Sequence, residues 1–151
     1  MEIIQSGDVL LRGYDKYVDG KFIPDEKGYS HAGLYAGNND VIHAVSPCVE
    51  RTSIIDFCQC DRIMVLRPAI TESNFAVEKA ESMIGVPYDF NYESDVGRLY
   101  CFELIANCHP DAHMEEYDVS KFLGLIKRKC YLAKSIYGNG FFMNIFEKND
   151  M

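Results

Sequence analysis

Two residues of this chain have the side chains of a thiol-based active site: His31, in the stretch Ser30–Gly37, and Cys101, in the stretch Tyr100–Leu104. A cysteine attacks as its thiolate, so a catalytic cysteine needs a helix N-terminus or a cationic neighbour that lowers its pKa. Cys101 stands where an apolar helix is expected to begin, and a histidine opposite it would accept the thiol proton and return it to the leaving group. The pattern predicts Cys101 as nucleophile and His31 as base, with a third polar group that orients the imidazole.

Each of these residues also has an ordinary structural interpretation. Free cysteine is among the most buried residue types, and Cys101 shares an apolar stripe with Leu104, Ile105 and Cys108 at helical spacing. A single histidine is likewise more often a hydrogen-bonded structural residue than a catalytic one. Residue type and spacing alone therefore leave both interpretations open.

Strand-like segments are expected to carry the histidine. Links between them are short and contain turn residues, and such links join antiparallel neighbours, so the segments predict a meander. A further buried strand is expected over 9–11, and Asp19-Gly20 predicts a hairpin or small flap over 17–23 beside the histidine. The four segments of the meander are 32–36, 41–45, 51–57 and 62–67.

The pattern becomes helical after Pro68. A first helix has Ala76, Ala80 and Met83 or Ile84 on one face and ends near Gly85. The apolar spacing from Cys101 to Cys108 predicts the helix of the nucleophile. The remaining expected elements are a helix over 119–127 and a closing apolar run over 141–146.

Composition limits the class of protein. With 151 residues, 48% of them hydrophobic, we expect a single domain, 1–151, with a substantial core. A formal net charge of -8 argues against a nucleic-acid binder, which needs clustered Lys and Arg. The N-terminus has an early acid, Glu2, and neither a basic segment nor a long apolar run, which predicts no signal peptide and no membrane span. Six cysteines in a chain that can build a core predict reduced thiols and a cytoplasmic protein.

Six short motifs follow one another along most of the chain. They are GDVLL (residues 7–11), SHAGLYAG (30–37), VIHA (41–44), VLRP (65–68), GVPYDF (85–90) and YCFELI (100–105). In this order they resemble the circularly permuted branch of the NlpC-type papain-like cysteine hydrolases, the YiiX-like and YebB-like group. The order of all six is far more specific than any one of them.

The resemblance implies an α+β, permuted papain-like (NlpC-type) fold, in which an antiparallel meander sheet or partial barrel packs against the helix of the nucleophilic cysteine. It implies a cysteine hydrolase, peptidase or amidase, that cleaves an amide or ester bond through a thioester on Cys101 with His31 as base. The alternatives are an acyltransferase acting on lipid-like acyl groups and a catalytically inactive papain-like binding module. The expected partner is a peptide, amide or acyl-ester substrate, and the mechanism requires no metal or organic cofactor.

His43 is the first candidate for the orienting group. In the YiiX-like group this position is often an acid, whereas lecithin retinol acyltransferase-like relatives have a second histidine there, and the separation of 43 minus 31, or 12 residues, resembles theirs. An odd-membered loop between the two strands would place both histidines on one face as diagonal neighbours, whereas an even-membered loop would turn His43 away. Asp40 and Glu50 are the substitutes.

Two tyrosines are candidates for substrate binding or oxyanion stabilisation, beside the backbone N–H of Cys101. Tyr88 lies in the matched Pro-Tyr-Asp motif, although packing on the cysteine helix explains it equally well, and Tyr100 precedes the cysteine. The helix dipole is sufficient reason for Glu103 in the first turn. A solvated acidic loop that attracts a cationic substrate group is expected at Asp89, Glu93 and Asp95.

The other cysteines and histidines give weaker indications. Cys58-Gln59-Cys60 and Cys108-His109 offer metal ligands, but no second Cys-x-x-Cys spacing completes a zinc site, so no metal is expected. His109 and His113 are expected on the surface.

Overall fold

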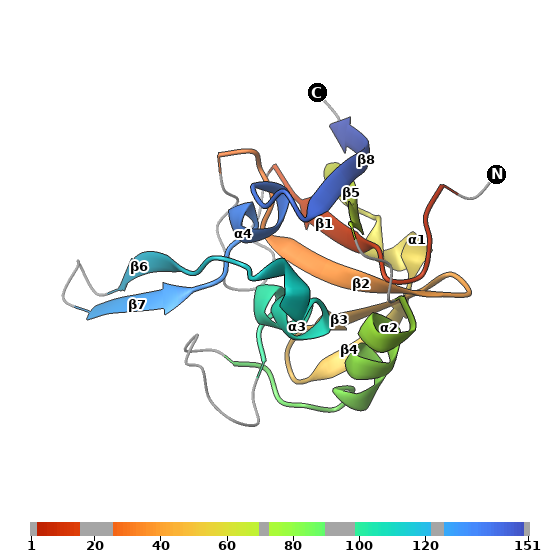
Figure 1. The fold of residues 1–151 in the computed structure, drawn as a ribbon, viewed down its shortest axis with the longest axis horizontal. Helices are drawn as coiled ribbons and strands as arrows, with labels where there is room; N and C mark the ends of the chain where they lie inside the picture. Colours follow the sequence, from red (N-terminus) through yellow and green to blue (C-terminus); the bar gives the residue numbers. More distant parts are fainter. Residues whose placement is uncertain (1–2, 16–25, 70–72, 90–98, 122–125, 150–151) are drawn as a thin grey trace.

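The computed structural model describes residues 3–15, 26–69, 73–89, 99–121 and 126–149. A six-stranded antiparallel sheet forms its centre, with the strands in the order β4-β3-β2-β1-β5-β8. Helices α2 and α3 pack on this sheet, and a separate β6–β7 hairpin extends from the body (Figure 1). The strands of the large sheet are β1 (Val9–Gly13), β2 (His31–Gly37), β3 (Asp40–Ala44), β4 (Val49–Ser53), β5 (Arg62–Pro68) and β8 (Phe142–Asn149). The other elements are α1 (Ile54–Phe57), α2 (Ser73–Ser82), α3 (Cys101–Cys108), the 3-10 helix η1 (Pro110–Ala112), β6 (Tyr117–Lys121), β7 (Ile126–Cys130) and α4 (Lys134–Tyr137).

The two faces of β2 contribute to different hydrophobic clusters. Ala32 and Leu34 are buried in the large cluster that also contains the apolar side chains of α3. Tyr35 belongs to a smaller cluster with Phe57 of α1, and the ring of His31 also contacts Phe57. Because side chains alternate along a strand, β2 separates a helix side of the sheet from a Phe57 side.

A β-bulge decides which way His43 points. The turn pairs Gly37 with Asp40, and a continuous ladder from that pair would place His43 opposite Leu34, on the helix side. The register instead shifts between Tyr35 and Gly37, so that Leu34 pairs with Ile42 and Tyr35 with Val41. This one-residue shift turns His43 to the face of His31, as the odd-membered connection would require.

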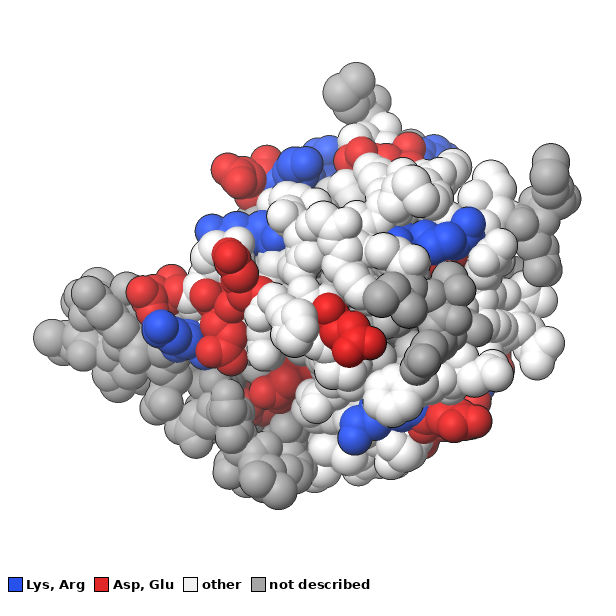
Figure 2. Space-filling model, in the orientation of Figure 1, with Lys and Arg blue, Asp and Glu red and all other residues white. Residues whose placement is uncertain are grey.

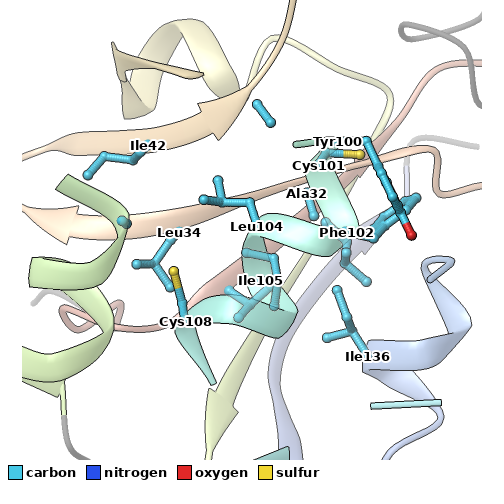
Figure 3. Packing of buried hydrophobic residues seen from close by; sticks show 14 of the residues in the cluster. Ala32, Leu34, Ile42, Tyr100, Cys101, Phe102, Leu104, Ile105, Cys108 and Ile136 are labelled. Carbon is cyan, nitrogen blue, oxygen red and sulfur yellow. The ribbon is translucent and has the colours of Figure 1, made fainter. Parts of the chain in front are cut away.

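Helix α3 has the apolar stripe that the sequence predicts. Cys101, Leu104, Ile105 and Cys108 are all buried, and the helix packs on β2 and β3. Figure 3 shows these side chains packed with Ala32, Leu34 and Ile42 of the sheet. The first turn of α3 is therefore held against the start of β2.

Three predicted elements are wrong in part. The segment 62–67 forms β5 but pairs with β1 rather than extending the meander beside β4. The segment 51–57 is a strand only to Ser53, because the Ser53 hydroxyl accepts a hydrogen bond from Asp56 N–H at 3.1 Å and begins α1. The helix expected over 119–127 is replaced by strands β6 and β7, which pair antiparallel. The hairpin or small flap expected over 17–23 lies outside the described residues.

Two of the sequence motifs meet in a buried ion pair. Asp8, from the first motif, accepts hydrogen bonds from Arg67 of β5 at 3.1 Å to Oδ1 and 2.9 Å to Oδ2. The Gln5 backbone N–H donates to the same carboxylate at 2.8 Å. His109 Nε2 lies 3.0 Å from the Gly7 carbonyl oxygen. These contacts tie the chain before β1 to β5 and to the end of α3.

Charged side chains of both signs are scattered over the face seen in Figure 2, between larger areas of uncharged residues. On the face seen in Figure 2, the Lys and Arg side chains lie among Asp and Glu side chains. Among the described residues, no helix is both long enough and apolar enough to cross a bilayer.

Candidate active site

A buried pair of histidines forms the centre of the site. His31 Nε2 lies 2.9 Å from His43 Nδ1, and the two rings meet edge to face with their centroids 5.1 Å apart. Their exposed fractions are only 4% and 5%. Because Nε2 of His31 faces His43, Nδ1 is the nitrogen of His31 that remains for proton transfer.

Phe57 and Arg12 enclose this pair. The Phe57 ring centroid lies 5.8 Å from that of His31 and 5.5 Å from that of His43. Arg12 is the cross-strand partner of His31, its guanidinium lies 4.5 Å from the Phe57 centroid, and it donates to the Phe57 carbonyl oxygen at 3.2 Å. A glycine is needed at position 33, since a Cβ there would come within 2.8 Å of the Phe57 ring.

Burial and the Arg12 charge keep both imidazoles neutral. Burial, then Arg12, then His43 hold the pKa of His31 well below its usual 6.5. Burial, followed by Arg12, lowers the pKa of His43 to about 4. A neutral imidazole has a lone pair available, so the pair is suited to accept a proton at neutral pH.

Cys101 is the first residue of α3, on the helix side of β2. It is 1% exposed and belongs to the cluster that contains Ala32, the residue next to His31 (Figure 3). The described ring contacts of His31 are to His43 and Phe57, on the other side of the strand. The thiol and the histidine pair therefore flank the first residues of β2. Tyr100 precedes the helix in an extended conformation and its side chain makes no capping hydrogen bond.

The two candidate tyrosines are buried. The Tyr100 hydroxyl accepts a hydrogen bond from the Tyr131 backbone N–H at 2.7 Å, which ties the chain after β7 to the base of α3. Figure 3 shows that hydroxyl at the far end of the ring from the Cys101 sulfur. Tyr88 packs in the same large cluster, and its backbone N–H donates to the Pro47 carbonyl oxygen at 3.1 Å. Both tyrosines thus have packing roles, and their participation in substrate binding stays a prediction.

A family model of permuted papain-like amidase enzymes, the YaeF/YiiX or C92 family, matches residues 3–130. The chain belongs to this family. The crystal structure of the metalloprotein yiiX from Escherichia coli O157:H7 (DUF1105) is similar to it, with a TM-score of 0.77 and 18% identity over 95% of this chain and 97% of that chain. Significant matches are absent among curated proteins.

These comparisons confirm the predicted permuted papain-like α+β fold, here with an open six-stranded sheet. Membership in a family of papain-like amidases also supports the general prediction of a hydrolase of the cysteine amidase kind. The sheet of this chain is not the simple meander that the sequence predicts, because β1 lies between β2 and β5.

Two carboxylates near the start of α3 are buried, contrary to one prediction. Asp89 is 1% exposed and so is not part of a solvated loop, while Glu93 and Asp95 lie outside the described residues. Glu103 is 8% exposed, and its Oε1 has no hydrogen-bond partner among the described residues. Burial, followed by the charge of Asp89, raises the pKa of Glu103 to about 7. A favourable interaction of a carboxylate with the helix dipole is therefore not sufficient to explain a buried glutamate with a raised pKa at position 103.

We predict that Glu103→Gln removes a pH dependence of stability. Folded Glu103 holds its proton up to about pH 7, whereas the unfolded side chain ionises near 4.5, so the wild type loses stability as pH rises between these values. The gap of about 2.5 pKa units corresponds to about 3 kcal/mol. Denaturant unfolding at pH 5 and pH 8 should show a smaller loss in Glu103→Gln than in the wild type. Equal losses in both proteins would contradict the assignment.

Among the described residues, the remaining cysteines and histidines are not grouped with other ligand side chains into a metal site. No disulfide joins the six cysteines, all of which lie in the described part of the chain. Within that part, no three or more His, Cys, Asp or Glu side chains are grouped to hold a metal ion. His109 is buried against Phe142, which corrects the expected surface position, while His113 is exposed. His109 Nε2–H donates a structural hydrogen bond to the Gly7 carbonyl oxygen, and such a long-range partner has no sequence signal.

Sequence reasoning missed Arg12 and Phe57 at this site. The only signal for Arg12 is its place directly after the apolar run of β1, where it becomes the partner of His31. The sequence predicts Phe57 at the end of a strand, whereas the short helix α1 places its ring against the histidines. Glu50, the predicted substitute for His43, lies beside His43 itself, with its Oε1 3.4 Å from His43 Nε2.

Proposed function

We propose that the protein is a cysteine hydrolase that cleaves an amide or ester bond through a thioester on Cys101, with His31 as general base and His43 as the residue that orients His31. The observation that carries the proposal is the 2.9 Å contact between His31 Nε2 and His43 Nδ1 at the start of β2, the strand on which α3 packs. Family membership supports the same reaction class.

In the proposed reaction, the Cys101 thiol and the His31 imidazole meet around the start of β2, where His31 Nδ1 takes the proton from Cys101 Sγ. The thiolate then attacks the carbonyl carbon. The tetrahedral intermediate collapses as the imidazolium gives this proton to the departing amine or alcohol. Water then loses a proton to His31 and adds to the thioester, which releases the acid and returns the thiol. The position of Cys101 at the N-terminal end of α3 favours the thiolate and the oxyanion.

An acyltransferase is the second candidate, and the second histidine at position 43 favours it. The thioester and its formation are the same, but an alcohol or amine acceptor replaces water in the final step. Product analysis with and without added acceptors separates hydrolysis from transfer.

The test uses a fluorescent thiol-reactive acyl probe. Labelling of the wild type should vanish in Cys101→Ala and fall sharply in His31→Ala. Equal labelling of wild type and Cys101→Ala would overturn the proposal and favour a papain-like binding module without turnover.

For the orienting residue, we predict that His43→Ala lowers the acylation rate about 100-fold or more while the protein stays folded. Without His43 the imidazole of His31 loses the hydrogen-bond partner at Nε2 that fixes its tautomer. Stopped-flow measurement of probe acylation gives the rate, and a thermal unfolding curve verifies the fold. An unchanged rate would move the role to another residue.

A further inference from the structure

His43 Nε2, the ring nitrogen that does not face His31, lies beside the carboxylate of Glu50. His43 Nε2 is buried and makes no hydrogen bond within the described part of the chain, and Glu50 Oε1 lies 3.4 Å from it. This distance is longer than a good N–H···O bond, but a small rotation of the Glu50 side chain would close it. Glu50 is able to rotate, since its side chain is 54% exposed.

The backbone fixes this contact. In the β3–β4 ladder His43 and Glu50 are direct cross-strand partners, and neighbouring pairs continue the same register on both sides, Ile42 with Arg51 and Ala44 with Val49. Directly opposite side chains in an antiparallel pair lie on the same face within contact distance. The sheet therefore places the Glu50 side chain on the same face as His43, within reach of Nε2.

The carboxylate selects one tautomer of His43. Burial and Arg12 keep the ring neutral, so one nitrogen carries a hydrogen and the other a lone pair. A lone pair on Nε2 would face the negative oxygens of Glu50, whereas an Nε2–H would donate to them. With the hydrogen on Nε2, the lone pair lies on Nδ1 and faces His31 Nε2 at 2.9 Å.

We propose that Glu50 is a positioning residue that holds His43 as the Nε2–H tautomer, so that His43 Nδ1 accepts from His31 Nε2–H and leaves the His31 lone pair on Nδ1. The effect of this relay from Glu50 through His43 to His31 on catalysis rests on the proposed function. The tautomers themselves are properties of the resting protein.

Nitrogen-15 NMR of protein labelled at histidine tests the relay, because the protonated and unprotonated nitrogens of a neutral ring have well-separated shifts. Wild type should show the Nε2–H form at both His31 and His43. Glu50→Gln should retain it, since the amide oxygen still accepts, and Glu50→Ala should shift His43 towards a mixture of tautomers. Glu78→Gln, which removes an exposed carboxylate from α2, is the matched charge control and should leave both rings unchanged.

The kinetic arm compares probe acylation in the same proteins. We expect Glu50→Ala to be about tenfold slower, and Glu50→Gln and Glu78→Gln to be close to wild type. An Nδ1–H tautomer at His43 in wild type, or an unchanged tautomer and rate in Glu50→Ala, would overturn the proposal. If no variant and no wild type reacts with the probe, the proposed function fails, whereas the relay is still decided by the NMR spectra.

Discussion

Replacing His31 with alanine is expected to lower the rate of Cys101 acylation about 1000-fold, within the range for loss of a positioned general base. His31 is neutral because burial and Arg12 hold its pKa well below 6.5, so its free nitrogen accepts a proton throughout the neutral range. Without it the thiol must lose its proton to water. The measurement is the rate of acyl-probe labelling at pH 7.

A matched control replaces a histidine outside the site. His113 is exposed and has a φ of 48°, a left-handed conformation that asparagine tolerates, so His113→Asn should fold and react like wild type. A His31→Ala rate equal to that of His113→Asn would remove His31 from the mechanism.

Replacing Arg67 with methionine is expected to destabilise the fold by about 3 to 5 kcal/mol. The Asp8 side chain is only 2% exposed, and Arg67 is its bidentate partner. Loss of the guanidinium leaves a buried carboxylate that keeps a hydrogen bond from the Gln5 backbone N–H. Removal of one partner from a buried pair is costly because the other stays charged and desolvated. Urea unfolding measures the difference.

Two controls make this prediction specific. Arg51→Ala breaks contacts with Asp40 and Glu81 that are solvent-exposed, and it should cost less than about 1 kcal/mol. The double variant Asp8→Asn with Arg67→Met removes the orphaned charge and should be more stable than Arg67→Met alone. A single variant as stable as Arg51→Ala would show that the ion pair is not important for the fold.

Local sequence patterns predicted the local elements of the fold. The apolar spacing of Cys101 to Cys108 specified α3 with its buried face, and the turn residues at 37–40 located the β2–β3 connection. The sequence predicts the strand β5 but not its pairing with β1, because pairing between distant strands depends on how the whole sheet is assembled. The segment of β6 and β7 is predicted as a helix because a short apolar run fits the helical and the strand periodicity equally well.

The histidine pair shows where sequence reasoning about the site reaches its limit. The twelve-residue spacing identified both members, but their meeting depends on a bulge of one residue between Tyr35 and Gly37. Gly37, with a φ of 88°, permits this bulge, but a glycine at a turn is equally compatible with a continuous ladder. The burial of Asp89 and His109 was missed because it is produced by segments distant in sequence.

The most direct test of the account locates the acyl group. Wild-type protein is acylated with the probe, digested under acidic conditions that preserve thioesters, and sequenced by tandem mass spectrometry. We predict a single acylated peptide with the thioester on Cys101, and its absence in His31→Ala at the same reaction time. Acylation on Cys48, Cys58 or Cys60 in place of Cys101, or an equal yield on Cys101 without His31, would contradict the proposed site.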